Sequence, residues 1–170
     1  MRNKSIGILI IAAAFVIVLA SIQGCSPNAT NPFTELKTGE LNATVSGIGS
    51  FYATNAYADS SGITYHVHAS MLDTNKVDSL VVDLLVLRKT PVPYTEDVTS
   101  DINNIITFCI VNQNGCNTYT ARQGNGNSSG TIKITSISPT LQGTFSGTVV
   151  LVGGSETRTI TNGEFNAAYN

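Results

Sequence analysis

The chain has 170 residues, of which 42% are hydrophobic and only 12% are charged, and its net charge is −2 at pH 7. The basic residues are few and scattered, so the composition disfavours nucleic-acid binding and a basic surface that would follow a membrane. The length suits one domain that is large enough to bury a core.

An apolar segment early in the sequence predicts a signal peptide. Arg2 and Lys4 precede 17 uncharged residues, Ile6 to Ile22. A basic stretch followed by an apolar one is typical of secretory signals, and its charges stay on the cytoplasmic side. The run ends in Ile22-Gln23-Gly24-Cys25. This ending resembles the lipobox of bacterial lipoproteins, although Gln23 stands where a small or β-branched residue is commoner. The resemblance implies a signal peptide over 1–24 and a diacylglycerol on the Cys25 thiol.

The residues that follow Cys25 favour this interpretation over an uncleaved signal anchor. Residues 26–32 are polar and contain two prolines, so we expect 25–39 to be a flexible tether. A diacylglycerol and an N-acyl chain together give stable anchoring. We therefore expect a lipid bilayer as partner through acylated Cys25, and a location in the cell envelope. Ser26 favours the outer membrane, facing the periplasm, since no acidic run that would favour surface export follows it.

Residues 40–170 predict an all-β domain. Alternating or apolar runs are separated by turn signals every eight to twelve residues, and no window has a helical period. We expect strands over 41–46, 51–58, 63–70, 80–87, 105–111, 118–122, 131–138, 144–152, 157–161 and 164–169. Asn162-Gly163 is a strong signal for a two-residue hairpin turn. The fold class is thus a single antiparallel β-sandwich or flattened barrel of about nine or ten strands, and the sequence does not separate these two forms.

Three of these segments have a more specific pattern. Along 63–70, Ile63, Tyr65, Val67 and Ala69 are expected to face inward, and Thr64, His66, His68 and Ser70 outward. The run 80–87 is apolar on both faces and predicts a central strand. Residues 89–104 are expected to be irregular because their two prolines block ladder hydrogen bonds.

The cysteine count bears on the covalent structure. If Cys25 carries lipid, two of the three cysteines remain, Cys109 and Cys116, and in an oxidising envelope they can pair. The stretch between them is rich in turn residues, so the bond would staple a hairpin. Two reduced thiols remain an alternative, because a turn at Asn114-Gly115 would place Gln113 opposite Cys116 and put the sulfurs out of register. A metal role is less favoured, since neither cysteine has a second Cys or His nearby.

The only histidines, His66 and His68, are the candidate metal ligands. Two residues apart on a strand, they share a face and could bind one ion. A third ligand would have to come from a neighbouring strand and cannot be named. The alternative is two solvated histidines on a polar face, which we favour, and we assign no metal and no cofactor. Asp83 interrupts the apolar run 80–87. It is either a buried functional carboxylate or, as we favour, a residue on an edge-facing or loop-adjacent side that is paired with an arginine or the backbone.

No catalytic motif is visible, and we expect a non-enzymatic structural or binding module. There is no nucleophile elbow, metalloprotease motif, phosphate loop or dinucleotide fingerprint. Acids in the 89–104 segment, Glu96, Asp97 and Asp101, could form a carboxylate pair, but such clusters are usually solvated. The alternative function is a small-ligand or glycan-binding barrel, which would need a deep pocket or aromatic platforms. The chain has no Trp, and Tyr57, Tyr94 and Tyr119 are the tyrosines expected near loops.

The C-terminal third carries a recognisable order of motifs: Gly130 to Thr135, Leu141 to Gly147 and Thr159 to Asn166. It resembles the end of a family of small envelope lipoproteins of unknown function that is typical of Bacteroidota-type bacteria. In that family a "G-x-I-x-I-T" strand, a "G-T-F-S" strand and a closing "T-N-G-x-F" hairpin follow one another. The match covers residues 130–166 and implies fold and location only, because the family brings no known catalytic residues.

Overall fold

The structure is a computed structural model that describes residues 35–73 and 78–170. The predicted signal peptide, Cys25 and most of the predicted tether lie outside the described residues. No helix in the described ranges is long and apolar enough to cross a membrane. Leu36 to Asn170 form one compact unit.

The described part of the unit is all-β, as predicted, with eleven strands instead of nine or ten. The strands are β1 (Glu40–Val45), β2 (Gly49–Ala53), β3 (Tyr57–Ser61), β4 (Thr64–Asp73), β5 (Asp78–Leu87), β6 (Tyr94–Asp97), β7 (Ile105–Asn112), β8 (Gly115–Ala121), β9 (Ser129–Ser136), β10 (Leu141–Leu151) and β11 (Thr157–Tyr169).

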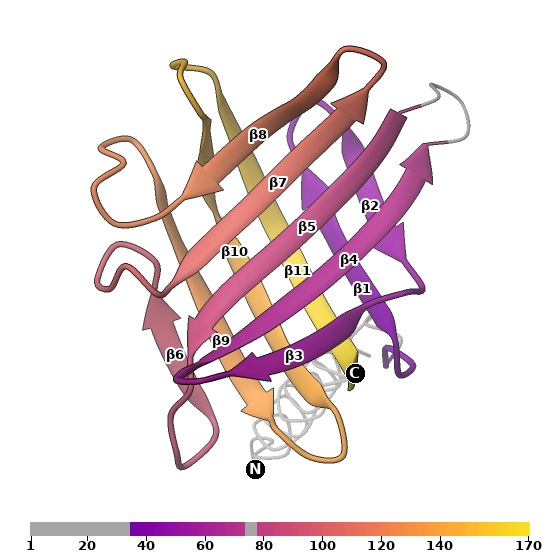
Figure 1. Ribbon diagram of the computed structural model, residues 1–170, viewed down its shortest axis with the longest axis vertical. Helices are drawn as coiled ribbons and strands as arrows, with labels where there is room; N and C mark the ends of the chain where they lie inside the picture. The colour runs from indigo at the N-terminus through magenta and orange to yellow at the C-terminus, as the bar shows by residue number, and fades with distance from the viewer. Residues whose placement is uncertain (1–34, 74–77) are drawn as a thin grey trace, which may run out of the picture. The chain divides into compact units, whose positions relative to one another are not determined.

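The strands form two layers (Figure 1). The front layer has the order β3-β4-β5-β7-β8, and every neighbouring pair in it is antiparallel. The back layer has the order β2-β1-β11-β10-β9-β6 and is antiparallel as well. Two antiparallel sheets packed face to face are the arrangement of a β-sandwich.

Two short pairings join the layers at their corners. Leu151 of β10 pairs with Tyr119 of β8, and Tyr169 of β11 pairs with Ala58 of β3. The β3–β11 pairing is parallel, so the sheet is mixed and not wholly antiparallel. Hydrogen bonding therefore runs around the whole unit, and the fold is a flattened barrel that has the layers of a sandwich.

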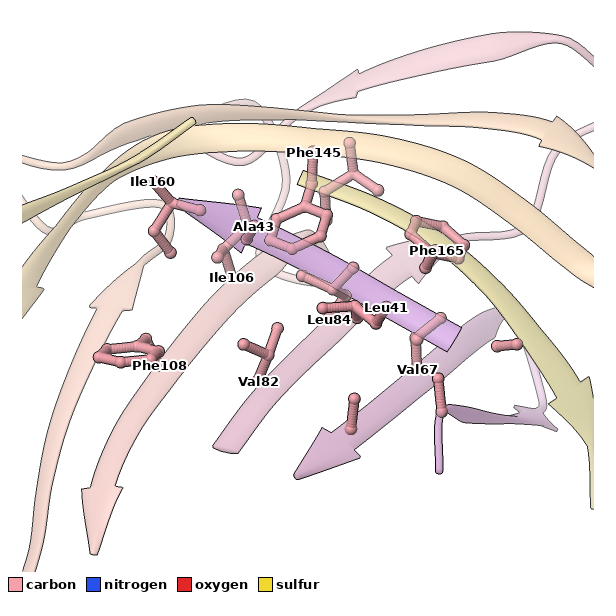
Figure 2. Packing of buried hydrophobic residues seen from close by; sticks show 14 of the residues in the cluster. Leu41, Ala43, Val67, Val82, Leu84, Ile106, Phe108, Phe145, Ile160 and Phe165 are labelled. Atoms are coloured by element: carbon pink, nitrogen blue, oxygen red, sulfur yellow. The ribbon is translucent and has the colours of Figure 1, made fainter. Parts of the chain in front are cut away.

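Apolar side chains from both layers fill the interior (Figure 2). Leu84, Ile106 and Phe108 of the front layer lie toward Leu41, Ile160 and Phe165 of the back layer. The largest side chains that are less than 2% exposed are Phe51, Phe108, Leu41, Leu84, Ile106, Ile132, Ile134, Leu141, Ile160, Val45, Val67 and Val82. In the strands that supply them, buried positions mostly alternate with positions that are at least partly exposed, because successive side chains of a strand point to opposite faces.

The expected strand over 51–58 was wrong, because this segment passes from one layer to the other. β2 pairs with β1 in the back layer, whereas β3 pairs with β4 in the front layer. Between the two strands, the Ala56 amide donates to the Gly39 carbonyl, and the Asn55 side chain bonds to Ser70. An alternating pattern reports strand conformation but not the neighbour of a strand, so the break was not visible in the sequence.

Other differences concern turns. Asn162-Gly163 is not a hairpin turn but lies within β11, where it forms a bulge. Asn162 has φ 52°, and the register shifts by one residue against both β1 and β10. Ile63, expected to face inward, lies in the β3–β4 turn and is 65% exposed. The segment 89–104 contains a strand that the sequence did not predict, β6, which adds to the edge of β9.

Candidate functional site

The structure brings His66, His68 and Asp83 together on the outer face of the front layer. His66 and His68 lie on β4 and point outward, as the alternation predicts, while Tyr65 and Val67 are buried. Asp83 lies on β5, directly opposite His68 in the β4–β5 pairing. Its neighbours Val82 and Leu84 face the core, so Asp83 faces outward. We call these three residues the His–Asp–His cluster.

One carboxylate oxygen contacts both imidazoles. Asp83 Oδ1 lies 2.7 Å from Nδ1 of His68 and 3.1 Å from Nε2 of His66. The side chains of His66, Asp83 and His68 are 41%, 31% and 28% exposed. The cluster is thus half-open to solvent, and Asp83 is neither the buried carboxylate nor the residue near an edge or loop that the sequence suggested.

Tyr57 packs beside the cluster. It lies on β3 directly opposite His68, and the centroids of the two rings are 5.0 Å apart. The His68 ring is therefore fixed by the tyrosine ring and by the hydrogen bond to Asp83. Neither histidine bonds to a serine or threonine hydroxyl within the described ranges, so no nucleophile is paired with an imidazole in this part of the chain.

A shallow depression adjoins the cluster and extends across four strands of the same face. Its volume is about 410 Å³, and it is lined by Ser61, Thr64, His66, Asp83, Leu85, Ile105 and Thr107. Leu85 and Ile105 supply apolar surface, and three hydroxyl side chains surround it. We call this depression the outer groove. Its size is within the range of small-ligand sites, but it is open and not enclosed between the layers.

The acids of the 89–104 segment do not line the outer groove. Glu96 is buried, forms a salt bridge with Lys89 and accepts a hydrogen bond from Asn104. Asp97 accepts hydrogen bonds from the hydroxyl and the backbone amide of Thr99, which lower the pKa of its carboxyl. Asp101 likewise accepts from Asn103 within its own turn. These carboxylates hold the connection around β6 in place.

Cys109 and Cys116 are joined by a disulfide bond, in agreement with the pairing that the sequence favours. The turn lies at Gln113-Asn114, so Asn112 pairs with Gly115 and Val111 with Cys116. The two cysteines are therefore diagonal neighbours across the β7–β8 hairpin, with Cα atoms 6.0 Å apart. This separation is within the usual range for a disulfide.

The tyrosines expected near loops do not form an aromatic platform. Tyr119 is buried beneath the guanidinium of Arg158, 5.7 Å from its ring centroid. The Tyr94 hydroxyl donates to the Leu87 carbonyl at 2.8 Å, and burial raises the pKa of this tyrosine. Tyr57 packs against His68 as described. Each of these three tyrosines thus has a local partner in the structure.

Sequence reasoning missed the pairing of Asp83 with the histidines, although a signal for it was present. The expected strands 63–70 and 80–87 are close together in the sequence and so predict a hairpin, in which a tight connection places Asp83 opposite His66 or His68. In the structure β4 and β5 pair with Asp73 opposite Asp78, which places His68 opposite Asp83. The register of the β4–β5 hairpin, rather than the composition of the strands, was the feature that predicted contact between Asp83 and a histidine.

Comparisons with known proteins identify no relative of this chain. No family model matches the chain, and no curated protein or solved structure matches it. The resemblance of residues 130–166 to small envelope lipoproteins therefore stays a prediction.

Proposed function

We propose that this chain is a lipid-anchored protein of the cell envelope whose flattened β-barrel is a non-enzymatic structural or binding module. The observation that carries the proposal is the order of elements before the domain. Basic residues, an apolar run, Ile22-Gln23-Gly24-Cys25 and a polar tether precede the first strand at Glu40. Each part has a role in export, acylation or spacing from the bilayer.

The filled interior supports a module that works through its surface. Large side chains such as Phe51, Phe108 and Ile160 occupy the space between the layers. A barrel that carries a ligand inside needs that space for the ligand. The outer groove lies instead on the solvent side of the front layer. A protein is the class of partner that such an open surface can accommodate.

The alternative is a small-ligand or glycan-binding lipoprotein, and the outer groove is the observation that favours it. Leu85 and Ile105 offer an apolar surface, while Ser61, Thr64 and Thr107 offer hydroxyl groups. Screening by NMR with mono- and disaccharides distinguishes a glycan-binding lipoprotein from a protein-binding or structural module. Shifts confined to residues of the outer groove support the alternative, and their absence supports a protein-binding or structural module.

Metabolic labelling with an alkyne analogue of palmitate tests the anchor. The variant Cys25→Ser is expected to abolish labelling, because position 25 then has no thiol to carry lipid. The double variant C109S/C116S is the matched control, because it removes two cysteines and leaves the proposed lipidation site intact. Equal labelling of C25S and the wild type would contradict the proposal.

A further inference from the structure

We propose that His66, His68 and Asp83 form a surface site for one divalent transition-metal ion, Cu(II) or Zn(II). The two histidines could bind an ion only weakly by themselves, and the sequence could not name a third ligand. The structure supplies one, because Asp83 lies opposite His68 on the adjacent strand. Two imidazole nitrogens and one carboxylate oxygen are a donor set that suits both ions.

The two nitrogen–oxygen distances in the cluster are near the separation that coordination requires. Ligand atoms about 2.0–2.1 Å from a tetrahedral zinc ion are about 3.3 Å from one another. The nitrogen–oxygen distances are 2.7 Å to His68 and 3.1 Å to His66. As the side chains lie in the described ranges, no group of three or more His, Cys, Asp and Glu residues could hold a metal ion. Binding thus requires side-chain rotations that exchange the two hydrogen bonds for bonds to the ion.

Charge and exposure favour this exchange. Asp83 brings a negative charge, and the residues that line the outer groove include no lysine or arginine. All three side chains are partly exposed, so an ion can reach them without opening of the core. Packing of Tyr57 against His68 limits the motion of one ligand. Three protein ligands leave at least one coordination position for water or for an external ligand.

The experiment uses the full chain in detergent without a polyhistidine tag, because His66 and His68 are then the only histidines. Selective labelling of histidine gives two imidazole signals in the NMR spectrum. One equivalent of Zn(II) is expected to shift both signals with saturation at one ion per chain. Cu(II) is expected to give an electron paramagnetic resonance spectrum with coupling to two nitrogens. Neither readout responds to an ion bound only at the Cys25 thiol.

Variants assign each ligand. His66→Ala and His68→Ala are each expected to weaken Zn(II) binding at least tenfold, and Asp83→Asn by about tenfold. Thr64→Ala is the matched control, since Thr64 lies on the same strand and face and lines the outer groove but is not a proposed ligand. Thermal unfolding of every variant verifies that the fold is retained, and His66→Gln replaces His66→Ala if it is not.

Three outcomes would overturn the site. They are unchanged imidazole signals after one equivalent of either ion, binding that survives loss of either histidine, and binding that is equally tight in Asp83→Asn. The test is independent of the proposed anchor, because it succeeds or fails whether or not Cys25 carries lipid.

Discussion

Both layers contribute buried apolar side chains to the core, but their strands differ in the regularity of their pairing. The front layer has no register shift in any of its four pairings, and its only glycine within a strand is Gly115, at the first position of β8. The back layer has shifts in three pairings, which link β1 to β11, β10 to β11 and β9 to β10. It also has glycines inside β9, β10 and β11.

The difference shows how each layer serves the fold. Bulges and glycines let the strands of the back layer bend and approach closely, which brings β10 and β11 to the corners where they meet the front layer. The regular front layer keeps its side chains in straight rows across neighbouring strands. His66, His68 and Asp83 can meet because the β4–β5 register is unbroken. The candidate site therefore belongs to the layer with the more regular pairing.

The largest expected effect tests the core of the front layer. Phe108→Ala should lower the free energy of unfolding by about 3–5 kcal/mol, because a fully buried ring is lost and a cavity remains. Urea denaturation followed by circular dichroism measures the change. Thr107→Ala, at the adjacent outward position, should change stability by less than about 0.5 kcal/mol. Equal losses in the two variants would contradict the orientation of β7.

A glycine of the back layer should show the next largest effect. In Gly143→Ala the new Cβ would lie 2.6 Å from Cζ of Phe165 and would also meet the backbone oxygen of Lys133. We expect a loss of about 1–3 kcal/mol from overpacking, measured by the same denaturation. Gly126→Ala is the control, because nothing lies within 4 Å of its Cβ position. A Gly143→Ala protein as stable as wild type would contradict this expectation and would show that β10 can move apart from β9 and β11 at no cost in stability.

Removal of the disulfide tests the end of the front layer. The double variant C109S/C116S should lose about 2 kcal/mol, because the bond closes only a short loop between strands that are already paired. Thermal unfolding with and without reductant measures this. Wild type under reductant should match the variant, and the variant itself should not respond to reductant. A response of the variant would mean that another bond is being reduced.

The smallest effect concerns the contact between the layers at β6. Tyr94 of the back layer donates to Leu87 at the end of β5, and burial raises the pKa of its hydroxyl. Because the folded pKa is raised, this contribution to stability is fully present below the usual tyrosine pKa of about 10. It is lost as pH rises through the folded value. Unfolding free energies between pH 8 and pH 11.5 should show this loss in wild type.

Tyr94→Phe should lack that part of the pH dependence and should lose about 1 kcal/mol at neutral pH with the hydrogen bond. Burial also raises the pKa of Tyr169, so the readout is the difference between the wild type and the variant and not the total pH dependence. Identical pH profiles would show that the hydroxyl of Tyr94 does not titrate differently in the folded state.

Local patterns of residues were enough to predict the class of the fold and the direction of most side chains. Alternation in 64–70 and the apolar run 80–87 gave the strands and the outward histidines, because successive side chains of a strand point to opposite faces. Tertiary structure alone decided which strands are neighbours. It split 51–58 between two layers, made Asn162 a bulge and closed the layers through β3 and β8. Strand pairing depends on contacts between residues far apart in the chain, and no local pattern of residues specifies them.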